Sequence, residues 1–171
     1  MERDNVYKIK GKPVTLVGPQ LKVGDKAPDF TLLDNSLNIV RLSDSKGKPR
    51  LISVVTSLDT DTCNIQTRTF NQELEKLGDQ ATVYTISADL PFAQNRYAVE
   101  NDIKTVKILS DHRTTSFGND YGLLIKDLRL LARAVIVVDK NDTITHMQIV
   151  PEGTEEPNYT TALEALKQAI G

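Results

Sequence analysis

Two short apolar runs separated by one helical segment constrain the fold of this chain more than any other feature. Residues 50–55 are rich in β-branched side chains and predict a buried strand, and residues 81–87 predict a second one. Between them, residues 63–77 contain neither glycine nor proline, and Gly78 follows where a C-terminal helix cap is expected. Three apolar side chains of this segment recur at helical spacing: Phe70, Leu74 and Leu77. A strand, a helix and a second strand in this order are typical of an α/β sheet.

Other patterns extend this unit in both directions. Residues 6–16 alternate around a Gly-Lys pair and predict an N-terminal β-hairpin. We expect further extended segments or strands at residues 21–34, 38–42, 106–109, 131–138 and 143–149, and further helices at residues 91–101, 115–121 and 157–170. Residues 131–138 form the longest expected strand, which pairs with residues 143–149 in an antiparallel hairpin. The order predicts an open mixed sheet with helices on both faces, in a single α/β domain over residues 1–171.

Composition argues against several classes of function. The 171 residues include 21 Lys and Arg against 23 Asp and Glu, with no concentrated basic patch, so nucleic acid is not an expected partner. The most apolar run, residues 130–138, is too short to span a bilayer. The charged start of the chain predicts no signal peptide, and we therefore expect a cytoplasmic protein. A single cysteine excludes an intramolecular disulfide and argues against a cysteine-based zinc site.

Cys63, the only cysteine, belongs to the first turn of the expected helix, beyond the carboxyl end of a strand. Unpaired backbone N–H groups and the helix dipole favour an anion there, and therefore the nucleophilic thiolate. The polar residues that precede it have loop and cap chemistry, and we expect Asp61 or Thr62 to cap the helix. The alternative is that Cys63 is a small buried hydrophobic residue without chemistry. The position alone leaves both interpretations open.

Arg133 and Thr60 are the other candidates for a functional site. Arg133 interrupts an apolar strand that is expected to be covered on both faces, where a charge needs an anion or a set of acceptors. That anion is either a structural Asp or Glu partner or the thiolate of Cys63. Thr60 lies three residues before Cys63, so its hydroxyl either faces the space above the sulfur or only caps the helix.

The remaining polar residues give weaker signals. His112 and His146 have no cysteine or second histidine at metal-ligand spacing, and we expect both to be structural or surface residues. Asp59, Asp61 and Asp89 are expected to be loop or capping carboxylates, and nothing in their spacing indicates a two-carboxylate hydrolase.

Several motifs together resemble one family. Thr60-Asp61-Thr62-Cys63 resembles the Thr-x-x-Cys element of peroxiredoxins. Further segments resemble the bacterial thiol peroxidase subfamily: Ser57–Thr60, Gln66–Asn71, Ser87–Gln94, Leu109–Gly118, Leu130–Val135, Gly11–Leu16 and Glu156–Tyr159. The resemblance covers nearly the whole chain. It implies a thioredoxin-like fold, with a mixed central sheet flanked by helices and an added N-terminal hairpin at about residues 1–17, and usually a homodimer with active sites near the interface.

The resemblance also implies a chemistry. Cys63 is the peroxidatic cysteine of a thiol-dependent peroxidase, and its thiolate attacks one oxygen of a hydroperoxide to leave a sulfenic acid. Thr60 hydrogen-bonds the peroxide, and Arg133 stabilises the thiolate and the charge on the leaving oxygen. Neither a metal nor an organic cofactor is implied. The implied partners are a hydroperoxide, either hydrogen peroxide or an organic one, and a thiol reductant.

Two residues depart from the subfamily pattern. Ala98 stands where a resolving cysteine is usual, so an external thiol is expected to reduce the sulfenic acid, either thioredoxin or a low-molecular-weight thiol. A longer-lived sulfenic acid makes overoxidation a liability. Thr56 stands where peroxiredoxins nearly always carry a proline that packs over the sulfur. These departures motivate two alternatives, namely a redox sensor or binding module that turns over poorly and a disulfide between the Cys63 residues of two chains.

Overall fold

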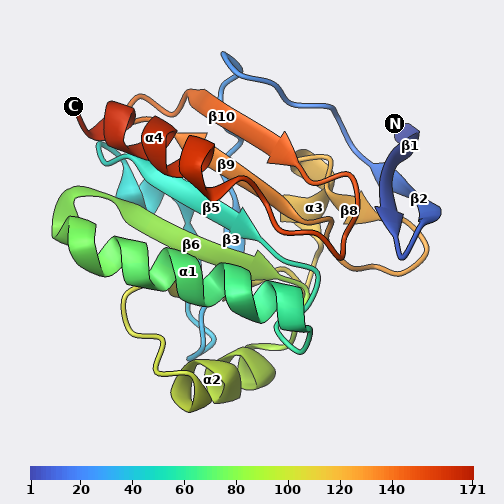
Figure 1. Cartoon of the computed structure of the whole chain (residues 1–171), viewed down its shortest axis with the longest axis horizontal. Coiled ribbons are helices and arrows are strands. Elements are labelled where there is room, and N and C mark those ends of the chain that lie inside the picture. Colours follow the sequence, from blue (N-terminus) through green and yellow to red (C-terminus); the bar gives the residue numbers. More distant parts are fainter.

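A computed structural model, which describes residues 1–171, contains a mixed sheet of seven strands and a smaller sheet of three. The large sheet has the order β10-β9-β5-β6-β7-β3-β4, and the small one has the order β1-β2-β8 (Figure 1). The strands are β1 (Glu2–Ile9), β2 (Lys12–Val17), β3 (Thr31–Leu33), β4 (Ile39–Arg41), β5 (Arg50–Val54), β6 (Thr82–Ser87), β7 (Lys107–Ser110), β8 (Leu124–Ile125), β9 (Ala134–Val138) and β10 (Ile144–Ile149). The helices are α1 (Asp61–Leu77), α2 (Pro91–Glu100), α3 (Ser116–Asp120) and α4 (Tyr159–Ile170), with 3-10 turns η1 (Leu42–Ser45) and η2 (Gly78–Gln80).

The centre of the large sheet is parallel and its flanks are antiparallel. β5, β6 and β7 run in the same direction, whereas β9 pairs antiparallel with both β5 and β10. Every residue of β5 and of β9 is buried. Strands that are covered on both faces are apolar along their whole length, which explains why these two were visible in the sequence as continuous apolar runs.

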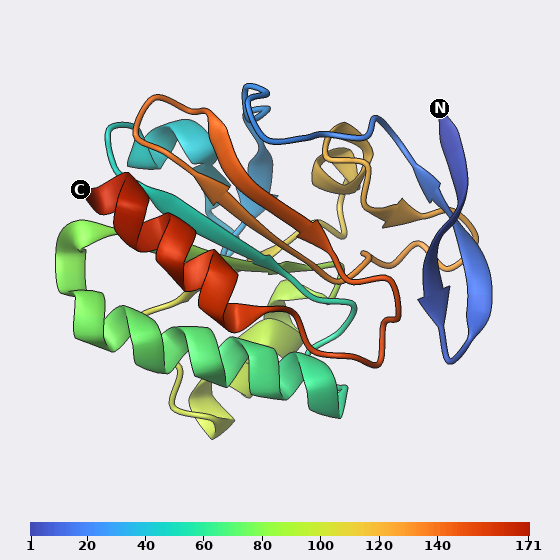
Figure 2. The ribbon, with the colours of Figure 1, turned by 45° about the horizontal axis from the view of Figure 1, so that its top comes forward.

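Side chains of the sheet alternate between two apolar cores. Leu51 and Val137 pack in the core that includes residues of α1, α2 and α4. Ile52 and Ile136 face the opposite core, which includes residues of α3, η1 and the N-terminal hairpin. Figures 1 and 2 show α1 and α4 side by side across one face of the large sheet. The predicted mixed sheet with helices on both faces is therefore confirmed.

The N-terminal hairpin lies against the end of the molecule at which β5 stops and α1 begins (Figure 1). The N–H of Lys8 donates to Pro151 O at 2.8 Å, and the N–H of Gly153 donates to Lys8 O at 2.8 Å. The carboxylate of Glu152 accepts the N–H groups of Lys10 and Gly11 at the hairpin turn. The predicted hairpin is confirmed, and its strand β1 is pinned to the segment that follows β10.

Three details of the structure differ from what was expected from the sequence. β9 begins at Ala134 and has five residues, so β1 with eight residues is the longest strand. The reason is that Leu131 leaves the large sheet to form a bridge with Leu124, and the N–H of Ala132 donates to Leu123 O at 2.8 Å. β8, which contains the partner residue Leu124, was not expected as a strand. The third correction concerns the helix cap, which is described with the site.

None of the helices is both long enough and apolar enough to cross a membrane.

Asp111 organises the short helix α3. Its Oδ1 accepts the N–H of Phe117 at 3.1 Å, its Oδ2 accepts the N–H of Gly118 at 2.9 Å, and the residue is 2% exposed. Burial raises the pKa of Asp111 to about 6 despite these two bonds, which favour the charged form. The side chain therefore ionises at a cost that the unfolded chain does not have.

We predict that Asp111 makes the protein less stable as the pH rises from about 4 to about 6. In this window the folded state keeps a proton that the unfolded state has released, so the free energy of unfolding falls with pH. The shift from 3.8 to about 6 corresponds to a loss on the order of 2–3 kcal/mol. Urea unfolding of the wild type and of Asp111→Asn at both ends of the window measures it. A stability difference between the two proteins that does not change with pH would contradict the prediction.

Candidate active site

Cys63 lies in the first turn of α1, just beyond the end of β5, and its side chain is completely buried. The N–H of Asn64 makes the first helical hydrogen bond, to Thr60 O at 3.0 Å. The N–H groups before it have no hydrogen-bond partner: Asp61, Thr62 and Cys63. The predicted position of Cys63 is confirmed. Cys63 therefore belongs to the turn with three free N–H groups, at the positive end of the helix dipole.

The N-cap residue of α1 is Thr60, which precedes the helix, so the expectation that Asp61 or Thr62 caps the helix is wrong. The Thr60 side chain makes no capping bond either, because its hydroxyl donates to Ser57 O at 2.9 Å. With its proton used in this way, Thr60 Oγ1 presents lone pairs to its surroundings. It is placed to accept a hydrogen bond from a bound ligand.

The loop between β5 and α1 is fixed by Asp89, which follows β6. Asp89 Oδ1 accepts the hydroxyl of Ser57 at 2.8 Å, and Oδ2 accepts the N–H of Leu58 at 2.9 Å and the hydroxyl of Ser87 at 2.7 Å. Because β5 and β6 are parallel neighbours, their carboxyl ends meet at the same edge of the sheet. The expected role of Asp89 as a loop carboxylate is confirmed. The carboxylates of Asp59 and Asp61 accept no hydrogen bond in the structure.

Arg133 is buried immediately before β9, with 2% of its surface exposed. Its Nε and Nη2 donate to Gly153 O at 3.1 and 2.7 Å, and its Nη1 donates to Gln66 Oε1 at 2.9 Å. No carboxylate pairs with it, so the expected structural ion pair is not formed. These bonds use three of the five N–H groups of an arginine, which leaves one free on each terminal nitrogen. The buried positive charge has only neutral partners and favours a nearby anion.

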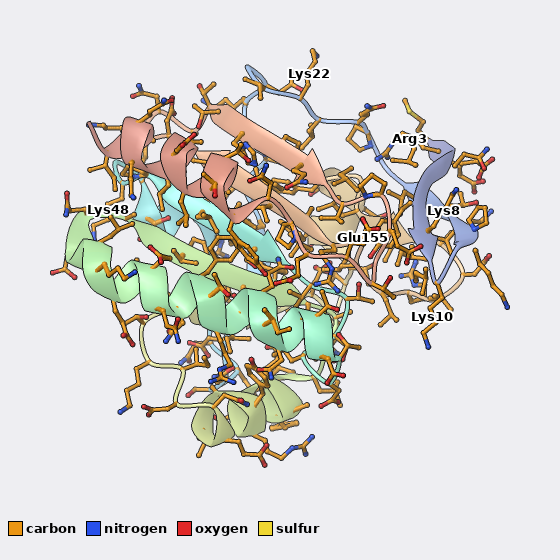
Figure 3. The ribbon with its side chains drawn as sticks, in the orientation of Figure 1. Arg3, Lys8, Lys10, Lys22, Lys48 and Glu155 are labelled. Carbon is orange, nitrogen blue, oxygen red and sulfur yellow. The ribbon has the colours of Figure 1, made fainter.

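A cavity of about 400 Å³ opens at this end of the molecule. Its wall consists of Tyr7, Ile9, Lys10, Thr56, Asp59, Thr60, Asp61, Thr62, Arg133, Gly153 and Thr154. Thr60 and Arg133 thus come together in one wall, whereas Cys63 is not part of it, in keeping with its buried side chain. Figure 3 shows Lys8 and Lys10 on the hairpin and Glu155 on the loop after β10, at the same side of the molecule. A cavity of similar volume, about 430 Å³, lies beside Gly78 at the other end of α1 and contains none of the candidate residues.

Three residues of the site were not predicted from the sequence as site residues: Tyr7, Gln66 and Gly153. Tyr7 is fully buried, and its hydroxyl accepts the backbone N–H of Arg133 at 3.1 Å across 126 positions of sequence. A Cβ atom at Gly153 would lie 2.5 Å from the Tyr7 Oη, which explains the glycine. Gln66 is oriented by its amide nitrogen, which donates to Ser53 Oγ at 2.8 Å and thereby turns the amide oxygen to Arg133.

A further contact ties α2 to the first turn of α1. The hydroxyl of Tyr97 donates to Asn64 Oδ1 at 2.6 Å, and burial raises the pKa of Tyr97, which keeps this proton in place. Ala98, the next residue, is partly buried and packs against the core that also contains Cys63. Ala98 stands at the position of the resolving cysteine in the subfamily that this chain resembles. This position therefore lies on α2, the helix that Tyr97 links to the first turn of α1.

Both histidines lie outside the cavity wall. His112 is exposed after β7, and His146 is half-buried in β10, where burial lowers its pKa. The expectation of structural or surface histidines is confirmed.

Comparison with known proteins now identifies the family. Residues 22–163 match the sequence profile of the family described as Redoxin. The chain is 55% identical over 162 residues to a thiol peroxidase of Bacillus subtilis, covering 95% of this chain and 96% of that one. It is 52% identical over 161 residues to a thiol peroxidase of Listeria innocua, covering 94% and 97%. The chain belongs to the thiol peroxidases of the redoxin family.

Solved structures agree with this assignment. A peroxiredoxin-like protein from Aquifex aeolicus is 39% identical to this thiol peroxidase family member and superposes with a TM-score of 0.90, covering 95% of this chain and 96% of that one. A thiol peroxidase from Chromobacterium violaceum, at 20% identity and a TM-score of 0.85 over 95% of each chain, shows the same fold. The predicted thioredoxin-like fold and the resemblance to bacterial thiol peroxidases are confirmed.

We predict that Asp89→Asn lowers the free energy of unfolding by about 1–3 kcal/mol. Both carboxylate oxygens of Asp89 accept hydrogen bonds, and the amide nitrogen that replaces one of them cannot accept any. Urea unfolding measures this change. Asp59→Asn is the matched control, since its exposed carboxylate accepts no hydrogen bond, and its effect is expected to stay within about 0.5 kcal/mol. Equal effects of the two substitutions would show that Asp89 does not hold the loop.

Proposed function

We propose that this protein is a thiol-dependent peroxidase that reduces hydrogen peroxide and organic hydroperoxides at Cys63. The observation that carries the proposal is the electrostatic setting of the only thiol. Free N–H groups of α1 and of the buried Arg133 guanidinium lie at the same end of the molecule, and no carboxylate forms an ion pair with the guanidinium, although Asp59 and Asp61 are in the same cavity wall. Such a setting stabilises a thiolate and the charge that develops on a leaving oxygen.

The chemical step uses the three candidate residues. The Cys63 thiolate attacks the terminal oxygen of the hydroperoxide, so an S–O bond forms while the O–O bond breaks. Cys63 is oxidised to a sulfenic acid, and the leaving oxygen takes up a proton to become water or an alcohol. Thr60 accepts the O–H of the bound hydroperoxide, because its own proton is donated to Ser57 O. The free N–H groups of Arg133 donate to the peroxide oxygens.

The return to the thiol requires an external reductant, because Cys63 is the only cysteine. A thiolate of thioredoxin or of a low-molecular-weight thiol attacks the sulfenic sulfur, releases water and forms a mixed disulfide, which a second thiol then reduces. Since the Cys63 side chain is fully buried and is not part of the cavity wall, both this step and the attack on the hydroperoxide require the first turn of α1 to open. A disulfide between the Cys63 residues of two chains requires the same opening.

We predict that Cys63→Ser abolishes peroxide consumption, because serine cannot form a sulfenic acid. The measurement is the intact mass of the reduced wild type and of the variant after stoichiometric hydrogen peroxide, with and without a sulfenic-acid trap. The wild type is expected to gain one oxygen atom, to be captured by the trap and to be restored by thioredoxin or a small thiol. Peroxide turnover that is unchanged in the variant would contradict the mechanism.

The sulfenic acid is also expected to be overoxidised when no thiol is present. Without a resolving cysteine it persists, so excess peroxide converts it to the sulfinic acid. Intact mass is expected to show the gain of two oxygen atoms at Cys63 in excess peroxide alone. Reductant added together with the peroxide is expected to prevent this gain. A protein that stays at the sulfenic state in excess peroxide would contradict the prediction.

A second candidate function is a redox sensor on the same scaffold, favoured by Ala98 and by Thr56. A stable mixed disulfide of Cys63 with one partner protein and negligible turnover would support it. We further propose a cytoplasmic homodimer. Support for the dimer comes from α2, where Phe92 and Val99 lie two turns apart and are 68% and 74% exposed.

A further inference from the structure

Thr56 adds a hydroxyl to the cavity wall at a position where a proline would have none. Thr56 follows β5 directly and is half-buried in the wall that also holds Thr60 and Arg133. Its Oγ1 lies 3.4 Å from the hydroxyl of Tyr7, and this is the only hydrogen bond of the Thr56 side chain.

The bonds of Tyr7 decide where the protons of this pair point. The Tyr7 oxygen accepts the backbone N–H of Arg133 at 3.1 Å, and Thr56 Oγ1 is its other partner. The distance alone fits either hydroxyl as the donor, and the phenol proton is assigned to this bond because Thr56 Oγ1 is its one acceptor within the protein. The Thr56 oxygen then accepts this bond, and its own proton has no acceptor within the protein. That proton is free to be donated to a ligand in the cavity.

Thr60 has the opposite hydrogen-bonding role to Thr56. Its proton is donated to Ser57 O, so it offers an acceptor to the cavity, whereas Thr56 offers a donor. An organic hydroperoxide has one O–H group and hydrogen peroxide has two, and both have two oxygen acceptors, so either substrate matches one acceptor and one donor in the same cavity wall. An acceptor at Thr60 and a donor at Thr56 would bind the hydroperoxide in one orientation.

We propose that Thr56 is a further catalytic residue, whose hydroxyl donates a hydrogen bond to the leaving oxygen of the hydroperoxide, and that Tyr7 is its positioning residue. The proposal rests on the peroxidase function proposed above. Thr56 keeps its proton throughout. As the thiolate of Cys63 attacks and the O–O bond breaks, negative charge grows on the leaving oxygen, and the hydrogen bond strengthens. Solvent then protonates that oxygen to give water or the alcohol.

The test is the second-order rate constant for oxidation of Cys63 by hydrogen peroxide in the reduced full-length protein, measured by stopped flow in a single turnover. Thr56→Val, which keeps the shape and removes the hydroxyl, is expected to slow oxidation about tenfold, the effect of one lost hydrogen bond. Thr56→Ser is expected to retain most of the wild-type rate. Thr69→Val is the matched control, because that hydroxyl bonds Ile65 O within α1, away from the cavity, and its rate is expected to be unchanged.

The role of Tyr7 is tested by coupling. Tyr7→Phe is expected to slow oxidation, and the double variant of Tyr7→Phe with Thr56→Val is expected to be no slower than Thr56→Val alone, because Tyr7 acts through Thr56. Independent, multiplying effects would overturn the positioning role and leave Tyr7 as a support of Arg133. Urea unfolding of each variant confirms that it is folded. If Tyr7→Phe does not fold, Thr56→Val and Thr56→Ser still decide the role of Thr56.

Two failures are distinguishable. A wild type in which Cys63 is not oxidised by peroxide would overturn the peroxidase function and, with it, this inference. A wild type that is oxidised rapidly while Thr56→Val reacts at the same rate or faster would overturn the role of Thr56 alone.

Discussion

The buried guanidinium of Arg133 is the interaction on which the active-site end of this protein depends. A second guanidinium, that of Arg50, is equally buried at the other end of the sheet, but Asp142 pairs with it. Arg133 has no such partner, and its bonds run instead to the segment after β10, to α1 and, through its backbone, to the N-terminal hairpin. An unneutralised charge in a buried position is costly. The peroxidase function proposed above supplies an anion for it, namely the Cys63 thiolate or the leaving oxygen.

The parallel centre of the sheet explains why the site forms where it does. β5 and β6 end side by side, and Asp89 after β6 holds the loop that leads from β5 to Cys63. The helix that follows then directs its free N–H groups to the same edge. The N-terminal hairpin reaches this edge from the small sheet and contributes the hydroxyl of Tyr7, and the loop after β10 contributes Gly153. Local chain direction therefore places the nucleophile, and long-range pairing completes its surroundings.

The difference between local and long-range contacts also explains which features could be predicted from the sequence. The strand and the helix around Cys63 follow from residues that are close in sequence, and so do the two doubly buried strands, whereas the N-cap of α1 was misplaced by one or two residues. Arg133 was conspicuous because a charge interrupts an apolar run. Its partners were not predictable, since Gly153, Gln66 and Tyr7 lie 20, 67 and 126 positions away. The start of β9 was misplaced because Leu131 is as apolar as a strand residue but bridges to Leu124 outside the large sheet.

Burial of Cys63 affects both halves of the proposed cycle. A hydroperoxide is small enough for the cavity of about 400 Å³, but Cys63 is fully buried and is not part of the cavity wall, so the peroxide and the reducing thiol both require the sulfur to become exposed. The Tyr97 hydroxyl holds the first turn of α1 through Asn64 and therefore resists this exposure. Because α2 carries Ala98 and no cysteine, no disulfide between α2 and Cys63 can form to stabilise an opened first turn of α1. In the proposed cycle, opening of the first turn of α1 is therefore a step that oxidation and reduction of Cys63 have in common.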